Sequence, residues 1–139
     1  MKVGNKNLCF YFFYQTLFII FSRKKIMDNL ITGERIADLL SIKGIDFEQK
    51  KMFGGLCFLV DDKMLAGTYK GGIMARVSPE EADLLAEKPG VSHMIHGGRA
   101  MPGYLMIESE VYDSDEALGY WLDKCLEYNP KAKSSKKKK

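Results

Sequence analysis

The sequence predicts an α+β fold, with helices gathered on one face of a mostly antiparallel sheet. Two observations lead to this prediction. From residue 46 to residue 109, short apolar segments alternate with paired glycines or aspartates, a pattern typical of strands joined by tight turns. Apolar residues of two segments, 31–42 and 117–126, recur at intervals of three and four, as in amphipathic helices, and Ser78-Pro79-Glu80-Glu81 is a helix-start signal. We therefore expect one domain with the order α-β-β-β-β-α-β-β-α.

The first half of this order is predicted mainly by turn and capping residues. Thr32 belongs to the residue types favoured at helix N-termini, and the helix that it would open ends at Gly44. The segment Asp46–Tyr69 then predicts three strands, with turns at Gly54-Gly55 and Asp61-Asp62. A meander of antiparallel strands should follow the first helix.

The second helix interrupts the strands. Gly71-Gly72 leads into a fourth strand, Ile73–Val77. Ser78-Pro79 then combines a capping residue with the proline favoured at the first helical position, and the helix should end near Lys88. The fourth strand is thus followed directly by a helix.

Two strands and a helix complete the predicted domain. The strands, Val91–Ile95 and Gly103–Ser109, lie on either side of a glycine-rich loop. Asp113 or Ser114 would cap the last helix. Its apolar face, with the spacing of a buried stripe, consists of Ala117, Leu118, Trp121, Leu122, Cys125 and Leu126. This helix should pack on the sheet.

The charges are distributed unevenly along the chain. The net charge is +3, but residues 27–130 contain 18 acidic and 10 basic side chains and so carry about −8. A surface that binds duplex nucleic acid needs clustered Lys and Arg to neutralise phosphates. We therefore do not expect the folded body to bind nucleic acid.

The reactive residue types form no catalytic or ligand-binding pattern. Cys9, Cys57 and Cys125 are too few and too scattered for a disulfide framework, so we expect a reduced, cytoplasmic protein. His93 and His96 are three residues apart, but the sequence places no third metal ligand beside them. It also contains no nucleophile motif and no nucleotide-binding loop. We accordingly expect no catalytic residues, no metal and no cofactor in a protein that is not an enzyme.

Residues 1–26 form a separate N-terminal extension. The run Leu8–Phe21 is apolar except for Gln15 and Thr16, and basic residues stand on both sides of it. Its fourteen residues are fewer than the roughly 20 that a transmembrane helix needs, and no signal cleavage site follows. Three interpretations stay open: a start assigned too early, with initiation at Met27, a membrane-associated helix, and a degenerate signal peptide.

Residues 131–139 are predicted to form a disordered tail. Lysine and serine dominate this segment, which has almost no apolar surface to offset the entropy of ordering. A tail of this kind contacts polyanions weakly and in a salt-dependent manner. The segment between the two ends, residues 27–130, is the expected domain.

Glycines, cations and aromatic residues of three segments are the remaining candidates for a functional surface. Arginines on a sheet face commonly pair with a local carboxylate, and aromatic residues in strands are commonly core, so a structural role is the alternative for each. The predicted contact surface comprises Lys51, Phe53, Gly54, Gly55, Arg76, Arg99, Met101 and Tyr104. In it the glycines shape the backbone, the cations bind carboxylate or phosphate, and the aromatic side chains supply contact area.

These segments resemble the N-terminal domain of the TfoX/Sxy family of competence regulators, over residues 31 to 128. The resemblance lies in Lys51-Met52-Phe53-Gly54-Gly55, Met64-Leu65-Ala66-Gly67-Thr68-Tyr69, Ala75-Arg76-Val77 and Gly98-Arg99-Ala100-Met101-Pro102-Gly103-Tyr104. The family's loop usually reads Gly-Arg-Pro-Met-Lys-Gly-Tyr. Ala100 and Pro102 depart from that pattern, and a loop lysine is lost.

The resemblance implies a compact domain similar to small secretion-chaperone-like folds, in proteins thought to raise transcription of DNA-uptake genes together with the cyclic-AMP receptor protein. It implies no catalysis. The full-length regulators also have a C-terminal domain for which this chain is too short. We therefore expect a stand-alone, non-enzymatic regulatory or adaptor module whose partner is a protein, such as a transcription factor or a second copy of the chain.

Two other functions stay open. The lysine tail would support binding to nucleic acid through its phosphates. Arg76 and Arg99, if they met, would support binding of a small anionic ligand. An enzyme acting on such a ligand would also need a general base, for which the sequence offers only the two histidines or carboxylates from distant segments.

Overall fold

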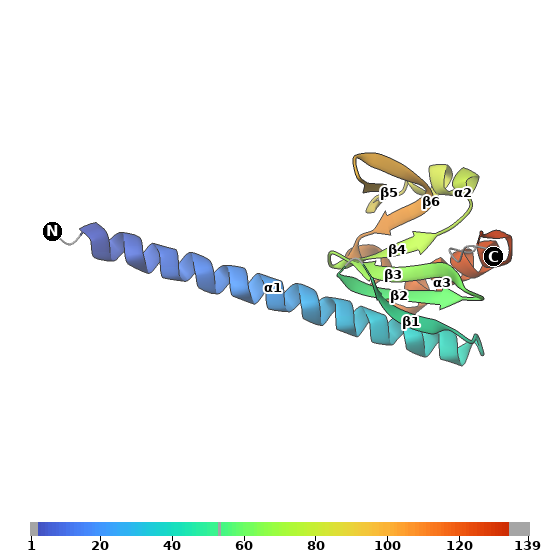
Figure 1. The fold of residues 1–139 in the computed structure, drawn as a ribbon, viewed down its shortest axis with the longest axis horizontal. Coiled ribbons are helices and arrows are strands. Elements are labelled where there is room, and N and C mark those ends of the chain that lie inside the picture. Colours follow the sequence, from blue (N-terminus) through green and yellow to red (C-terminus); the bar gives the residue numbers. More distant parts are fainter. Residues whose placement is uncertain (1–2, 53, 134–139) are drawn as a thin grey trace, which may run out of the picture.

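The computed structural model describes residues 3–52 and 54–133 of the 139-residue chain (Figure 1). In chain order the elements are α1 (Val3–Ile42), β1 (Glu48–Met52), β2 (Gly55–Val60), β3 (Lys63–Tyr69), β4 (Gly72–Arg76), α2 (Pro79–Leu85), β5 (Val91–His96), β6 (Arg99–Ile107), the 3₁₀ helix η1 (Ser109–Tyr112), α3 (Asp115–Tyr128) and the 3₁₀ helix η2 (Asn129–Lys131). The predicted α+β class and the predicted order of helices and strands are confirmed.

The strands of the described residues form one antiparallel sheet with the order β1-β2-β3-β4-β6-β5. The first four strands are a meander, because each pairs with the next along the chain. After β4 the chain passes through α2 and enters the sheet at its edge as β5. It then turns back, so that β6 lies between β4 and β5.

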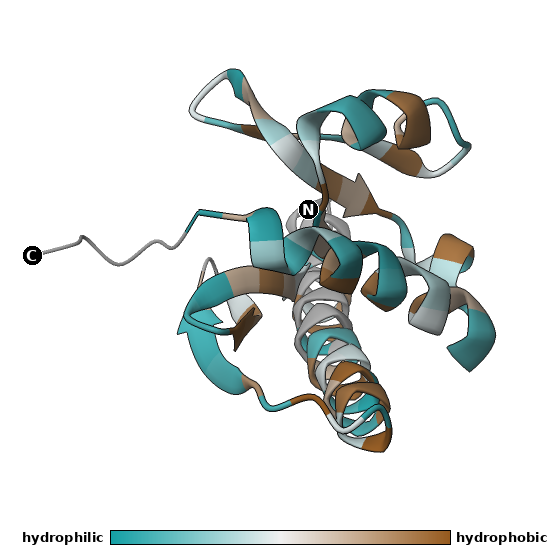
Figure 2. Cartoon of the chain, turned by 90° about the vertical axis from the view of Figure 1, so that its right-hand side faces the viewer, coloured by the Kyte–Doolittle hydropathy of each residue, from teal (hydrophilic) through white to brown (hydrophobic). Residues whose placement is uncertain are grey.

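The core lies on one face of this sheet. Cross-strand partners share a face, and the pairs Ala75 with Leu105 and Ile73 with Ile107 are fully buried. The same core includes Ile36 and Leu40 of α1, Ala82 and Leu85 of α2, and Leu118, Trp121, Leu122 and Cys125 of α3. Both views place α1 beside α3 (Figures 1 and 2). The prediction that the helices gather on one face is therefore confirmed.

The first helix begins far earlier than the predicted start at Thr32. Helix α1 is continuous from Val3 to Ile42, so Thr32 lies inside it, buried beside the Tyr112 side chain. A capping residue acts only where the chain enters a helix from another conformation, and no proline interrupts this stretch. The predicted end is correct, because Gly44 has φ +71° and the Ile45 N–H donates to the Leu40 carbonyl.

Only the last part of α1 joins the domain, while the rest projects away from it (Figure 1). Its buried positions are Thr32, Gly33, Ile36 and Leu40. Among the residues that the structure describes, no helix combines the length and hydropathy needed to cross a membrane.

The other two helices begin as predicted. The Ser78 Oγ accepts a hydrogen bond from the Glu81 N–H at 3.2 Å, and the Ser114 Oγ accepts one from the Ala117 N–H at 3.1 Å. Of the two proposed caps of α3, Ser114 is therefore the one used. Helix α2 ends at Leu85, three residues before the predicted Lys88. These caps fix where α2 and α3 cross the sheet.

The described residues continue to Lys133, past the predicted start of the tail at Lys131. Ala132 is buried, and the Asn129 side chain donates a hydrogen bond to the Val60 carbonyl at 3.1 Å. The Lys63 ammonium group also donates to the Asn129 carbonyl at 3.1 Å. Residues 129–133 therefore pack against the β2–β3 end of the sheet. The remaining tail, residues 134–139, lies outside the described residues.

Candidate functional site

The predicted contact residues at the first hairpin line a groove between that hairpin and α1. The groove encloses about 470 Å³. It is lined by Asn29 and Leu30 of α1 and by Lys51, Met52, Gly54, Gly55 and Leu56 of the hairpin. Phe53, the remaining predicted residue of this motif, lies outside the described residues. Three of the predicted contact residues thus converge on one concave surface.

The two glycines shape this groove in different ways. Gly54 has φ +75°, a conformation that side chains disfavour, and forms the turn between β1 and β2. Gly55 lies so close to β3 that a Cβ atom would stand 2.1 Å from the Thr68 carbonyl oxygen. The neighbouring Leu56 N–H donates to the Thr68 Oγ1 at 2.9 Å. The glycine pair therefore brings the hairpin onto β3 and opens the space in front of α1.

The groove is mainly apolar, with two polar groups. Leu30 and Met52 expose 50% and 40% of their surfaces there, more than core residues do. The Asn29 Oδ1 atom is buried and accepts no hydrogen bond from any described residue. Lys51 is exposed and pairs across the hairpin with Leu56. A ligand with an apolar side chain and a negative charge would match Leu30, Met52 and Lys51.

Arg76 and Tyr104 lie together on the sheet, but their contacts are internal to the chain. They are cross-strand partners, and the Arg76 guanidinium stands over the Tyr104 ring at 5.3 Å and over the Tyr128 ring at 6.0 Å. It also donates a hydrogen bond to the Lys133 carbonyl at 3.2 Å. Arg76 therefore contacts both the end of α3 and the segment that follows it. Its hydrogen-bond acceptor is a backbone carbonyl, whereas a local carboxylate was the expected alternative.

Arg99 and Met101 lie at the far edge of the sheet from the groove. Arg99 is exposed beside the turn between β5 and β6, opposite His96. Tyr104 follows Arg99 by five positions along β6, which is about 16 Å of strand. The two arginines do not meet, so the anion site that would require both Arg76 and Arg99 is not formed.

Met101 lines a second, smaller pocket of about 240 Å³ at this edge. There the His93 Nε2 lies 3.3 Å from the Asp83 Oδ1 of α2. Within the described ranges, no three His, Cys, Asp or Glu side chains are placed to share a metal ion. His93 thus links β5 to α2 across the rim of the pocket.

The two cysteines of the domain are enclosed in it. Burial raises the pKa of the Cys125 thiol to about 12. Burial also raises the pKa of Cys57, although nearby Lys50 opposes this shift. Since the thiolate is the nucleophilic form, both side chains are held in their unreactive state at neutral pH.

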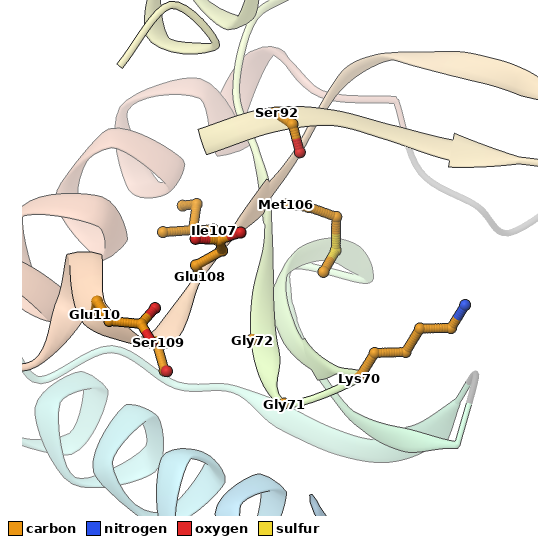
Figure 3. A pocket seen from close by; sticks show the side chains of 9 residues that line it. All are labelled: Lys70, Gly71, Gly72, Ser92, Met106, Ile107, Glu108, Ser109 and Glu110. Carbon is orange, nitrogen blue, oxygen red and sulfur yellow. The ribbon is translucent and has the colours of Figure 1, made fainter. Parts of the chain in front are cut away.

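A further pocket, of about 450 Å³, was not predicted from the sequence (Figure 3). Lys70, Ser92, Met106, Glu108 and Glu110 supply most of its lining side chains. The Lys70 and Glu110 side chains lie on opposite sides of it (Figure 3). The turn before β4 could be predicted, but the pocket exists only because β6 and β5 pack beside β4, and that pairing has no signal in the sequence.

The hairpin and the surrounding sheet lie within the part of the chain that matches a known family. The family model for the TfoX N-terminal domain matches residues 42–128. The chain belongs to the TfoX N-terminal domain family. The matched residues run from the end of α1 to the end of α3 and so include every strand. They also include both glycine motifs, the first at residues 51–55 and the second at residues 98–104. Searches of curated proteins and of solved structures gave no match. The resemblance predicted from the sequence is thus confirmed, with most of α1 outside the matched residues.

Proposed function

We propose that this TfoX N-terminal domain is a non-enzymatic regulatory module that contacts a protein partner, in the regulation of transcription, through the groove beside its first glycine motif. The single observation that carries the proposal is this groove. It combines a family motif, exposed apolar side chains and one exposed lysine, Lys51. These are features of a surface that accepts a polypeptide.

The chemistry of the groove supports a protein rather than a nucleic acid as the partner. Lys51 is the one cation among the lining residues, whereas phosphate recognition draws on several clustered cations. Residues 27–130 as a whole carry about −8. An acidic body would repel a nucleic acid and would attract a basic surface on a protein partner.

The interior chemistry supports a module without catalysis in a reducing compartment. Cys57 and Cys125 are free, buried and unreactive. The Arg76 guanidinium is engaged by aromatic rings and a backbone carbonyl. These groups are engaged within the fold, whereas Leu30 and Met52 of the groove are exposed. Free thiols agree with a cytoplasmic location.

The test is affinity capture from the lysate of the native cells with the full-length chain. Leu30→Asp with Met52→Asp places two charges in the groove. Leu84→Asp with Ile95→Asp is the matched control, because these side chains are 69% and 64% exposed and lie outside the groove. We expect one protein that is retained after nuclease treatment, lost with the groove variant and kept with the control. Equal retention by both variants would contradict the proposal, as would retention of nucleic acid alone through the lysine tail.

The predicted role of Arg99 can be separated in the same experiment. Arg99→Ala alters the exposed turn of the β5–β6 hairpin and leaves the groove intact. If capture falls with Arg99→Ala as well as with the groove variant, the partner spans both edges of the sheet. If capture falls only with the groove variant, Arg99 lies outside the contact surface.

A further inference from the structure

The N-terminal part of α1 is a helix without a covering partner in the fold. The N-terminal part of this helix projects away from the rest of the chain (Figure 1). Side chains described along this stretch are exposed although they are apolar: Leu17 by 38%, Ile19 by 51%, Ile20 by 56% and Met27 by 57%. Exposed apolar area on an isolated helix is unfavourable in water. A surface that covers this arm, residues 3–25, would therefore be stabilising.

In the sequence of the arm, apolar residues follow one another without the spacing of a single helical stripe. The run Leu8–Phe21 contains only Gln15 and Thr16 as polar interruptions, and successive helical residues are about 100° apart. A second helix would cover one stripe of such a surface, as in a coiled coil. A lipid environment contacts a much wider part of the circumference. The distribution therefore favours lipid over another copy of the chain.

The charges beside the run indicate the type of lipid. Lys2 and Lys6 precede it, and Arg23, Lys24 and Lys25 follow it. The first acidic residue of the chain is Asp28. Basic side chains next to an apolar segment are attracted to anionic headgroups. The acidic body would be repelled by the same headgroups, so the arm, and not the domain, must hold the chain at such a surface.

The length and composition of the run indicate how it would lie. At 1.5 Å per residue, its fourteen residues span about 21 Å, against about 30 Å for the hydrocarbon core of a bilayer. Two of the fourteen are Tyr, which is enriched at the boundary between headgroups and acyl chains, and five are Phe, which interfacial helices carry among their apolar residues. Basic groups at both ends can then contact the same layer of headgroups.

We propose that residues 3–25 of α1 bind the surface of an anionic phospholipid bilayer, with the apolar run at the headgroup boundary and the flanking basic residues at the phosphates. The arm then tethers the TfoX N-terminal domain, and its groove remains available because it is formed by the domain end of α1. This inference is independent of the identity of the protein partner.

The test is flotation of the full-length chain with lipid vesicles. The chain is purified in detergent, and the detergent is removed as the vesicles are added. One set of vesicles is pure phosphatidylcholine, and the other contains equal parts of phosphatidylcholine and phosphatidylglycerol. We expect strong flotation with the anionic set. Ile19→Asp with Ile20→Asp should abolish it, whereas the matched control Leu84→Asp with Ile95→Asp should float as the unmodified chain does.

The basic flank has its own variant. Replacing Arg23, Lys24 and Lys25 with glutamine should reduce partitioning to the anionic vesicles about a hundredfold, at roughly a factor of five for each charge. Flotation that survives Ile19→Asp with Ile20→Asp would overturn the proposal, because the lysine tail would then be responsible. So would a chain that stays in the aqueous layer, or one that forms a soluble dimer dissociated by these substitutions, since a second copy would then cover the arm.

Discussion

The close approach of Gly55 to β3 makes a quantitative prediction about the family's first glycine motif. In Gly55→Ala the new Cβ would lie 2.1 Å from the Thr68 carbonyl oxygen and 2.8 Å from its Oγ1. Unstrained carbon-to-oxygen contacts are about 3.3–3.6 Å, so β2 must move away from β3 by more than about 1 Å. That movement also breaks the hydrogen bond from the Leu56 N–H to the Thr68 Oγ1.

The expected cost is the sum of two effects. Overpacking of a close contact destabilises a protein by about 1–3 kcal/mol, and the lost hydrogen bond adds about 1 kcal/mol. We expect Gly55→Ala to lower the free energy of unfolding by about 2–4 kcal/mol. Gly119→Ala is the matched control, because Gly119 is helical and nothing stands within 4 Å of its added Cβ. Alanine should stabilise that position by about 0.5–1 kcal/mol.

Equilibrium unfolding in urea measures both variants, with the fluorescence of Trp121, the single tryptophan, as the signal. Trp121 is buried in the common core and should report its loss. The midpoint should fall for Gly55→Ala and rise slightly for Gly119→Ala. A Gly55→Ala variant as stable as the unmodified chain would refute the reasoning that this glycine is required by the contact with Thr68.

Two further predictions concern Arg76 and the buried thiols. Arg76→Ala should lower the free energy of unfolding by about 1–2 kcal/mol, because the ring contacts and the hydrogen bond to the Lys133 carbonyl are lost. The same substitution should speed removal of the C-terminal residues by carboxypeptidase. Urea unfolding and timed mass spectrometry measure the two effects. An unchanged digestion rate would contradict the proposed role of Arg76 in holding the C-terminal segment. Cys57 and Cys125 should resist iodoacetamide at pH 8 in the native state, because burial raises both pKa values, and peptide mapping should find them modified only after unfolding.

The fold class and most element boundaries could be predicted because they depend on local chemistry. Ser78 and Ser114 cap their helices as their side chains allow, and Gly44 ends the first one. The predicted start of the first helix, at Thr32, was wrong, also for a local reason. Thr32 has the chemistry of a cap, but the residues before it are also compatible with a helix, so the chain never leaves that conformation.

The candidate site was predicted less well, because it depends on which strands become neighbours. The Lys51 and Gly54-Gly55 motif does line a groove, yet Asn29, which lines the same groove, stands before the predicted start of the first helix at Thr32. Arg99 lies far from that groove because β6 inserts between β4 and β5. Strand order across a sheet has no counterpart in periodicity or turn residues, so no local pattern could separate Arg76 and Arg99.

The internal role of Arg76 was also beyond local reasoning. A strand that alternates apolar and polar residues indicates which face an arginine occupies, and Arg76 does share its face with Tyr104. It also contacts Tyr128, at the C-terminal end of α3, and Lys133, in the segment that follows this helix. The sequence predicted that segment to be disordered, so it offered no partner for the guanidinium.

The groove beside the first glycine motif is the surface that we propose binds a protein. The most direct measurement is photo-crosslinking in the native cells, with a photoreactive phenylalanine analogue at position 52 in the groove or, as control, at position 95 on the opposite edge of the sheet. We expect one discrete, nuclease-resistant protein adduct from position 52 and none from position 95. The same adducts from both positions, or adducts with nucleic acid alone, would contradict the claim.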